Sequence, residues 1–146
     1  MKNTLRSNIL TICFLLIAIS VLKINTSFLK VSGKVIIIDG NNMPINLREE
    51  KFISDIIVLA VKGKVKTIAG QKRIPIKKIS FKKYKSKTNK FGEFLLYLPP
   101  GKYTFFIKKD NSAYLNDFNG QGIFQQKSID KNRKDLILID DSNSLF

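Results

Sequence analysis

The stretch TNKFGEFLLYLPPGKYTFFI, which spans Thr88–Ile107, decides the fold class. It contains a turn, an apolar strand, a second turn and a second apolar strand, in that order. Side chains alternate along a strand, so the runs Glu93–Leu98 and Lys102–Lys108 each have one fully apolar face. Each large side chain on such a face contributes roughly 1.5–3 kcal/mol when it is buried, before entropy is subtracted. We therefore expect the two runs to form the central hairpin of a β-sandwich. The inward-facing residues are Phe94, Leu96, Leu98, Tyr103, Phe105 and Ile107.

Two turns bound these strands, and each has a local cause. The segment PPGK at 99–102 fits a type II turn, because Pro100 restricts φ at the second position and Gly101 accepts a positive φ at the third. Upstream, Asn89 can bond to its own backbone and Gly92 can adopt a left-handed conformation. We assign structural turn roles to Asn89, Gly92, Pro99, Pro100 and Gly101.

The chain from Val31 onward is built of short runs rich in Val, Ile, Phe and Tyr, separated by Gly, Asn, Asp and Pro. This pattern is typical of an all-β domain. An Asn cap at 46, followed by Glu49, predicts a short helix within Asn46–Phe52, and Gly63–Ile76 reads as a long turn or an irregular hairpin. Seven predicted strands suit an antiparallel Greek-key sandwich. They are Val31–Ile38, Asp55–Lys62, Lys77–Lys87, Glu93–Leu98, Lys102–Lys108, Gly122–Ser128 and Asp135–Ile139.

The N-terminal residues have the pattern of a secretory signal: Lys2 and Arg6 precede an apolar run from Ile9 to Leu22. This run is shorter than the roughly 20 residues of a transmembrane helix, although retention as an uncleaved anchor stays open. Cys13 superficially resembles the cysteine of a lipoprotein box, but Ile12 stands where Gly or Ala is needed. We expect a signal peptide or signal anchor at 1–27 and one folded domain at 28–146.

Composition excludes most enzyme chemistry. The chain has no His, which removes the commonest general base and metal ligand, and its one cysteine, Cys13, lies in the apolar run. Four acidic residues near the C-terminus do not have the spacing of a calcium loop, so no metal and no cofactor are expected. These four are Asp130, Asp135, Asp140 and Asp141.

Four short motifs occur in a recognisable order: SGKV within Val31–Val35, DG at 39–40 with PI at 44–45, TNKFGEF at 88–94 and LPPGKY at 98–103. In this order they resemble the carboxypeptidase regulatory-like domain family. Its members typically read S-G-x-V, D-G-x-P-L, T-D-x-x-G-x-F and L-P-P-G-x-Y. The chain departs from that pattern by an insertion at Asn46–Ser54 and by Asn89 in place of the usual Asp.

The resemblance implies a seven-stranded, prealbumin-like (transthyretin-like) sandwich that serves as a non-catalytic module of exported proteins. Enzymes of related sandwich families depend on His, which this chain lacks. Related collagen-adhesin domains form a Lys–Asn isopeptide bond with the help of a Glu. Ile107 stands at the position of that Glu, which argues against such a bond.

Lysine dominates the middle of the chain: between Ile56 and Gly92 there are twelve basic residues and no acidic one. Overall, 26 Lys and Arg face 11 Asp and Glu, a formal charge of +15. In two triplets the lysines alternate, so each triplet would occupy one face of a strand and repel itself unless an anion binds there. The candidate polyanion-binding residues are Lys62, Lys64, Lys66, Lys72, Arg73, Lys77, Lys78, Lys83, Lys85 and Lys87.

These lysines also have simpler interpretations, namely a solvated surface that protects strand edges from aggregation, or the codon usage of an AT-rich genome. Tyr84, Tyr97 and Phe106 suggest a carbohydrate-binding module as an alternative function, and a small enzyme of unknown chemistry is the third hypothesis. We expect an exported, non-catalytic module, periplasmic or extracellular, that contacts an anionic envelope polymer or lipid, or an envelope protein. Export argues against nucleic acid as the natural partner.

Overall fold

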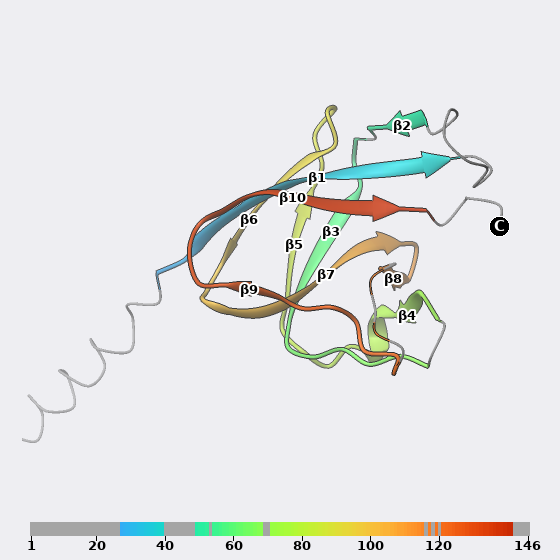
Figure 1. Ribbon diagram of the computed structural model, residues 1–146, viewed down its shortest axis with the longest axis vertical. Helices are drawn as coiled ribbons and strands as arrows, with labels where there is room; N and C mark the ends of the chain where they lie inside the picture. The colour runs from blue at the N-terminus through green and yellow to red at the C-terminus, as the bar shows by residue number, and fades with distance from the viewer. Residues whose placement is uncertain are drawn as a thin grey trace, which may run out of the picture.

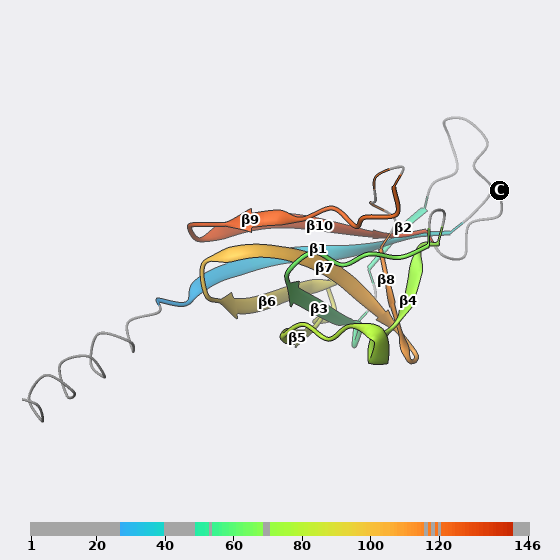
Figure 2. The ribbon, with the colours of Figure 1, turned by 90° about the horizontal axis from the view of Figure 1, so that it is seen from below.

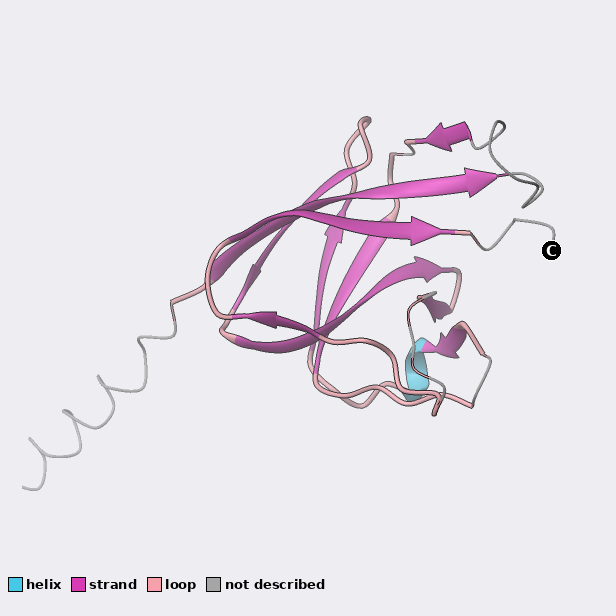
Figure 3. Ribbon diagram, in the orientation of Figure 1, coloured by secondary structure: helices cyan, strands magenta, loops and turns pink. Residues whose placement is uncertain are grey.

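The computed structural model describes residues 27–39, 49–52, 54–68, 71–115, 117, 119 and 121–141. Residues 1–26 of the signal segment predicted at 1–27 lie outside the described residues. So do residues 40–48, which include Gly40 of the DG motif and the whole PI motif. Among the described residues no helix has the length and apolar character to cross a membrane. The described chain is mostly strand, and the strands belong to two sheets, sheet A and sheet B (Figures 1 and 3).

Sheet A has β1 at its centre. One side of β1 pairs with β10, and the other side pairs with β6 over its first half and with β2 at its end. The sheet consists of β1 (Leu29–Asp39), β2 (Glu49–Lys51), β6 (Glu93–Leu98) and β10 (Arg133–Asp140).

Sheet B runs in the order β4-β8-β7-β3-β5, and β9 pairs with the beginning of β7. A 3₁₀ turn, η1 (Ile76–Lys78), follows β4. The strands of sheet B are β3 (Ile57–Lys62), β4 (Arg73–Pro75), β5 (Lys83–Lys87), β7 (Gly101–Lys109), β8 (Ser112–Tyr114) and β9 (Lys127–Ile129).

The predicted central hairpin is wrong, because β6 pairs with β1 in sheet A whereas β7 pairs with β3 in sheet B. Pro99 and Pro100 donate no backbone N–H, so neither can supply a ladder hydrogen bond between β6 and β7 at this corner. The chain instead passes from one sheet to the other there. Gly101 has φ +154°, which differs from the roughly +80° of a type II turn. The two apolar faces consequently meet across the core instead of lying side by side.

The expected inward-facing residues are all buried, which confirms the alternation. They join residues of β1, β3 and β10 in a core between the two sheets. β7 is buried on its other face too, where Thr104 and Phe106 are fully inaccessible. A second apolar cluster therefore lies outside sheet B, beneath the segments that precede β5 and β9. Its members are Leu59, Val61, Val65, Ile74, Ile79, Phe106, Ala113 and Phe124.

The antiparallel prediction fails for one strand pair: β1 and β10 run parallel, from Val31 opposite Arg133 to Ile37 opposite Asp140. No hairpin joins strands so far apart in sequence, so nothing local sets their relative direction. Gly33 lies at a register shift in this pair, and a Cβ atom there would come within 2.0 Å of the Leu136 carbonyl oxygen. The close approach of the two strands requires glycine.

Other strand predictions were partly wrong. Glu49–Lys51 is not helical but forms β2, paired with β1. The predicted strand Lys77–Lys87 contains η1 at its start, and only Lys83–Lys87 is strand. Within Gly122–Ser128, Ile123 makes an isolated bridge with Lys66, and the strand itself begins at Lys127. β4 and β8, which are three residues long, were not predicted.

Candidate polyanion-binding surface

The predicted turn, Asn89–Gly92, joins β5 to β6, and the side chain of Asn89 stabilises it. The Asn89 Oδ1 atom accepts hydrogen bonds from the backbone N–H groups of Phe91 (2.9 Å) and Glu93 (3.0 Å). The Asn89 Nδ2 atom donates to the Glu93 carboxylate at 3.0 Å. That hydrogen bond, followed by the charge of Lys34, lowers the pKa of Glu93. An Asp at 89 would keep the two accepted bonds but lose the donor to Glu93.

β5 confirms one of the two expected lysine ladders. Lys83, Lys85 and Lys87 are exposed and share a face of the strand, while Tyr84 and Ser86 face the other way. β5 is an edge strand of sheet B, because among the described strands it pairs only with β3.

The opposite face of β5 helps to close the domain against sheet A. The Tyr84 ring packs edge-on against Tyr103, with 6.0 Å between ring centroids. The backbone N–H of Leu95 in β6 donates to the Ser86 hydroxyl at 3.4 Å. The two sheets are therefore joined on the β5–β6 side.

The other expected ladder, Lys62, Lys64 and Lys66, does not form. β3 ends at Lys62, and Gly63 turns the chain with φ +126°. Val65 is then buried in the outer cluster, which leaves Lys64 and Lys66 exposed on an irregular segment. All three lysines reach solvent, but not as a strand face.

Lys77 and Lys78 lie in η1 and are exposed. The residues that flank them anchor the turn, because Ile79 is buried in the outer cluster and Ile76 packs against that cluster. The anchoring presents both ammonium groups to solvent.

Lys72 and Arg73 belong to a different environment, next to the C-terminal end of β10. The Lys72 Nζ atom lies 3.3 Å from the Asp141 carboxylate, and the Arg73 guanidinium lies 5.9 Å from the centroid of the Tyr114 ring. Tyr114 donates its hydroxyl to Asp141, and burial together with this contact raises the pKa of Tyr114. These two cations already have partners within the fold, so the structure separates them from the other candidates.

Seven candidates remain, which we call the unpaired lysine set. Each is exposed, and none forms an ion pair with a carboxylate in the part of the chain that the structure describes. Lys87 is excluded because its Nζ atom lies 2.7 Å from Asp55. The set consists of Lys62, Lys64, Lys66, Lys77, Lys78, Lys83 and Lys85.

The aromatic residues that suggested a carbohydrate platform are not brought together. Phe106 is fully buried, with its ring centroid 4.9 Å from that of Phe124. Tyr84 packs against the inner core, whereas Tyr97 is 56% exposed on sheet A. A sugar ring could therefore not stack on the three side chains at once. The four C-terminal aspartates do not converge either, and no group of His, Cys, Asp or Glu suited to a metal ion occurs within the described ranges.

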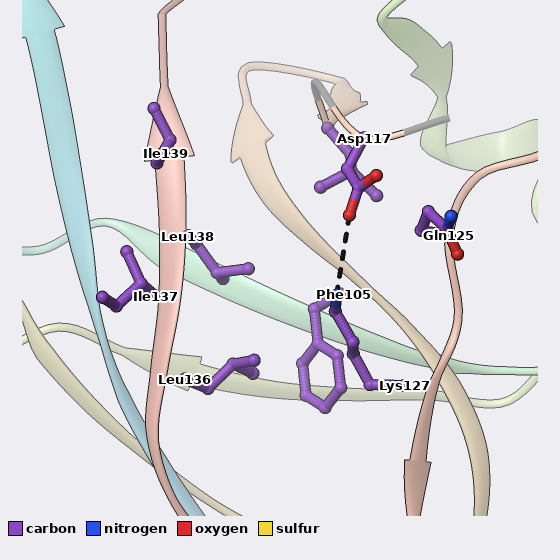
Figure 4. A pocket seen from close by; sticks show the side chains of 9 residues that line it. Phe105, Asp117, Gln125, Lys127, Leu136, Ile137, Leu138 and Ile139 are labelled. Carbon is purple, nitrogen blue, oxygen red and sulfur yellow. Dashed lines mark ion pairs between the residues drawn. The ribbon is translucent and has the colours of Figure 1, made fainter. Parts of the chain in front are cut away.

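A cleft that the sequence did not indicate opens between β10 of sheet A and the segment that leads into β9 of sheet B. Its volume is about 260 Å³, and Phe105, Leu136 and Leu138 contribute to its apolar wall. Figure 4 shows Lys127 and Asp117 forming an ion pair at this cleft, with 3.7 Å between Nζ and the carboxylate. The residues come from four separate segments between Phe105 and Ile139, so no single local pattern marks them.

Comparison with protein-family models, with curated proteins and with solved structures found no match.

Proposed function

We propose that this chain is an exported, non-enzymatic module that binds an anionic polymer or lipid surface of the cell envelope through the unpaired lysine set. In this proposal the two sheets form a Greek-key sandwich of the carboxypeptidase regulatory-like type. The motifs in β1, in the 88–94 turn and in the 98–103 corner support that assignment. The export part of the proposal rests on the N-terminal sequence pattern.

The observation that carries the binding proposal is the difference between lysines that pair with a carboxylate and lysines that do not. The seven lysines of the unpaired lysine set are exposed and lack a carboxylate partner among the described residues, while other cations, such as Lys72 and Lys109, have one. Like charges that share a strand face, as those of Lys83 and Lys85 do, repel each other when unscreened, and a bound polyanion relieves that repulsion and releases its own counterions. Lysine, a point charge on a flexible stem, suits irregular polyanions more than a defined bidentate ligand.

A purely structural role is the second candidate, and the position of β5 favours it. An edge strand exposes unpaired backbone groups, and lysines on such a strand prevent pairing with other chains. Lys83 and Lys85 can do this without any ligand. The two roles predict different consequences when these charges are removed.

Calorimetric titration of the full-length protein with polyphosphate, and separately with polygalacturonate, tests the binding role. Both polymers are soluble, so the apolar N-terminal run does not contribute through membrane insertion. The triple variant Lys77→Gln, Lys83→Gln, Lys85→Gln should bind about tenfold more weakly, with a shallower dependence of affinity on salt. The matched control is Lys30→Gln, Lys131→Gln, Lys134→Gln, which removes three exposed charges elsewhere.

Equal losses in the two triple variants would mean that only net charge matters and would contradict the proposal. If affinity is unchanged but Lys83→Gln, Lys85→Gln self-associates by light scattering, the lysines protect the edge and the structural role is correct.

A further inference from the structure

β10 is an edge strand of sheet A, and its central part has an open backbone edge. It pairs with β1 on one side, and none of the described strands pairs with its other side. The open part is Leu136–Ile139, between Asp135, which has a left-handed φ of +60°, and the buried Asp140. Unpaired N–H and C=O groups along such an edge can form a ladder with an added strand.

The edge strands β5 and β10 differ in whether charged side chains protect them from pairing with another strand. β5 carries exposed lysines at alternate positions, which block the approach of another strand. The open part of β10 reads LILI and carries no charge. An apolar edge without such protection is a liability unless something covers it.

Apolar side chains are available on both faces of this edge. Leu136 and Leu138 are each 5% exposed and border the cleft, whereas Ile137 and Ile139 are 59% and 45% exposed on the outer face. A strand laid along β10 would place alternate side chains into the cleft, towards Phe105, and the others beside the two isoleucines (Figure 4). Backbone pairing and side-chain burial would thus be satisfied together.

We propose that the Leu136–Ile139 edge of β10 binds an extended peptide segment of an acidic partner protein by strand addition, with apolar residues at its centre. The open edge selects an extended backbone, since only a peptide strand can satisfy it, and the cleft selects apolar side chains. A formal charge of +15 on this chain disfavours a second copy and favours a partner of opposite charge. Figure 2 shows β9 and β10 on one side of the molecule and β5 with η1 on the opposite side, so this surface is separate from the lysines of β5 and η1 and goes beyond the proposed lysine function.

Amide hydrogen exchange of the full-length protein tests the proposal. The probes are short peptides with glutamates at both ends and, at their centre, Thr alternating with Val, Ile, Leu or Phe. At least one of them should slow exchange of those amides within Leu136–Ile139 that point away from β1 by about tenfold or more at saturation, because each new ladder bond must open before exchange. Ile139→Lys should abolish this protection by placing a charge on the edge, and Leu115→Trp should abolish it by filling the cleft from its half-buried wall.

The matched control is Ile68→Lys, the same substitution at a residue that is 71% exposed and outside any strand, and it should leave protection intact. Thermal unfolding establishes that each variant is folded; if Leu115→Trp is not, Ile139→Lys still decides. The proposal is overturned if no peptide slows exchange at Leu136–Ile139, or if the slowing occurs only at other strands. It is also overturned if the amides that point away from β1 are already protected without peptide and sedimentation shows a dimer, because the occupant would then be a second copy.

Discussion

The hydroxyl of Tyr103 donates a 2.7 Å hydrogen bond to the carbonyl oxygen of Pro99, four residues earlier. This bond ties the start of β7 in sheet B to the corner that follows β6 of sheet A. Tyr103 is fully buried in the inner core, where its ring contacts Tyr84 and lies 6.4 Å from Phe105 between centroids. The corner at 99–101 is therefore fixed by a side chain that belongs to the core.

Tyr103→Phe should lower the free energy of unfolding by about 1 kcal/mol, because it removes this hydrogen bond while keeping the ring. Burial, with Tyr84 as a lesser cause, raises the pKa of Tyr103 to about 12 from 10.0. The unfolded state therefore ionises first, so the contribution of Tyr103 to stability is complete below pH 10 and is lost as the pH rises towards 12. Urea unfolding at pH 8 and pH 11 should show a smaller alkaline loss for Tyr103→Phe than for the wild type. An equal loss would mean that the phenol does not titrate in this way.

Gly33→Ala should be strongly destabilising, by about 2 kcal/mol or more, because its Cβ would collide with the Leu136 backbone and separate β1 from β10. Ser32→Ala, one residue away on the opposite face of β1, is the control and should change stability by less than about 0.5 kcal/mol. The midpoints of urea unfolding measure both. Similar midpoints for the two variants would contradict the close approach of the strands.

Asn89→Ala should destabilise the 88–92 turn by about 1–2 kcal/mol, since it removes both backbone bonds accepted by the side chain. Asn89→Asp should keep most of the stability but raise the pKa of Glu93, because the Nδ2 donor is lost and a negative charge is added. NMR titration of the Glu93 side-chain carboxyl carbon checks the direction. The stabilising effect of the low pKa is present above the ordinary value of 4.5 and disappears as the pH falls below it. A lower pKa in Asn89→Asp would refute the assigned donor.

Lys109 at the end of β7 forms an ion pair with Asp140 at the end of β10. The protein should lose more stability when one of these partners is replaced than when both are replaced. Asp140 is 1% exposed, so Lys109→Met takes an ammonium group away from a buried carboxylate and should cost about 3–5 kcal/mol. Asp140→Leu combined with Lys109→Met should recover a large part of that loss, because the buried carboxylate is then removed as well. A double-mutant cycle by chemical unfolding measures the coupling. Additive effects would show that the two groups do not interact.

Local sequence patterns were enough to predict several parts of the fold correctly. Alternation in Glu93–Leu98 placed that strand to the residue and identified its buried face. The same reasoning correctly placed the lysines of β5 on one face. The corner at 99–101 was wrongly predicted as a hairpin turn, because a tight turn and a passage between two sheets use the same local residues. Their difference lies in which strands β6 and β7 pair with, and those partners are distant in sequence.

The candidate site was predictable only where it depends on one strand. The ladder at Lys62–Lys66 failed because Gly63 ends β3, and Val65 is needed by the outer cluster. The partner of Lys72 could not be anticipated, because Asp141 is 69 residues away. The cleft beside β10 could not be predicted either, because Phe105, Lys127 and Leu138 meet only when both sheets are assembled.

The pairing of β1 with β10 also governs when this protein can fold. The backbone N–H of Lys30 donates to the Asn132 side chain at 2.8 Å, across 102 residues of chain. A nascent chain that has not yet reached Arg133 lacks the strand that completes sheet A, and closing so long a loop makes native contacts slow to form. The polypeptide therefore lacks native sheet A until β10 has been synthesised, and truncation within β10 should remove the native fold rather than trim it.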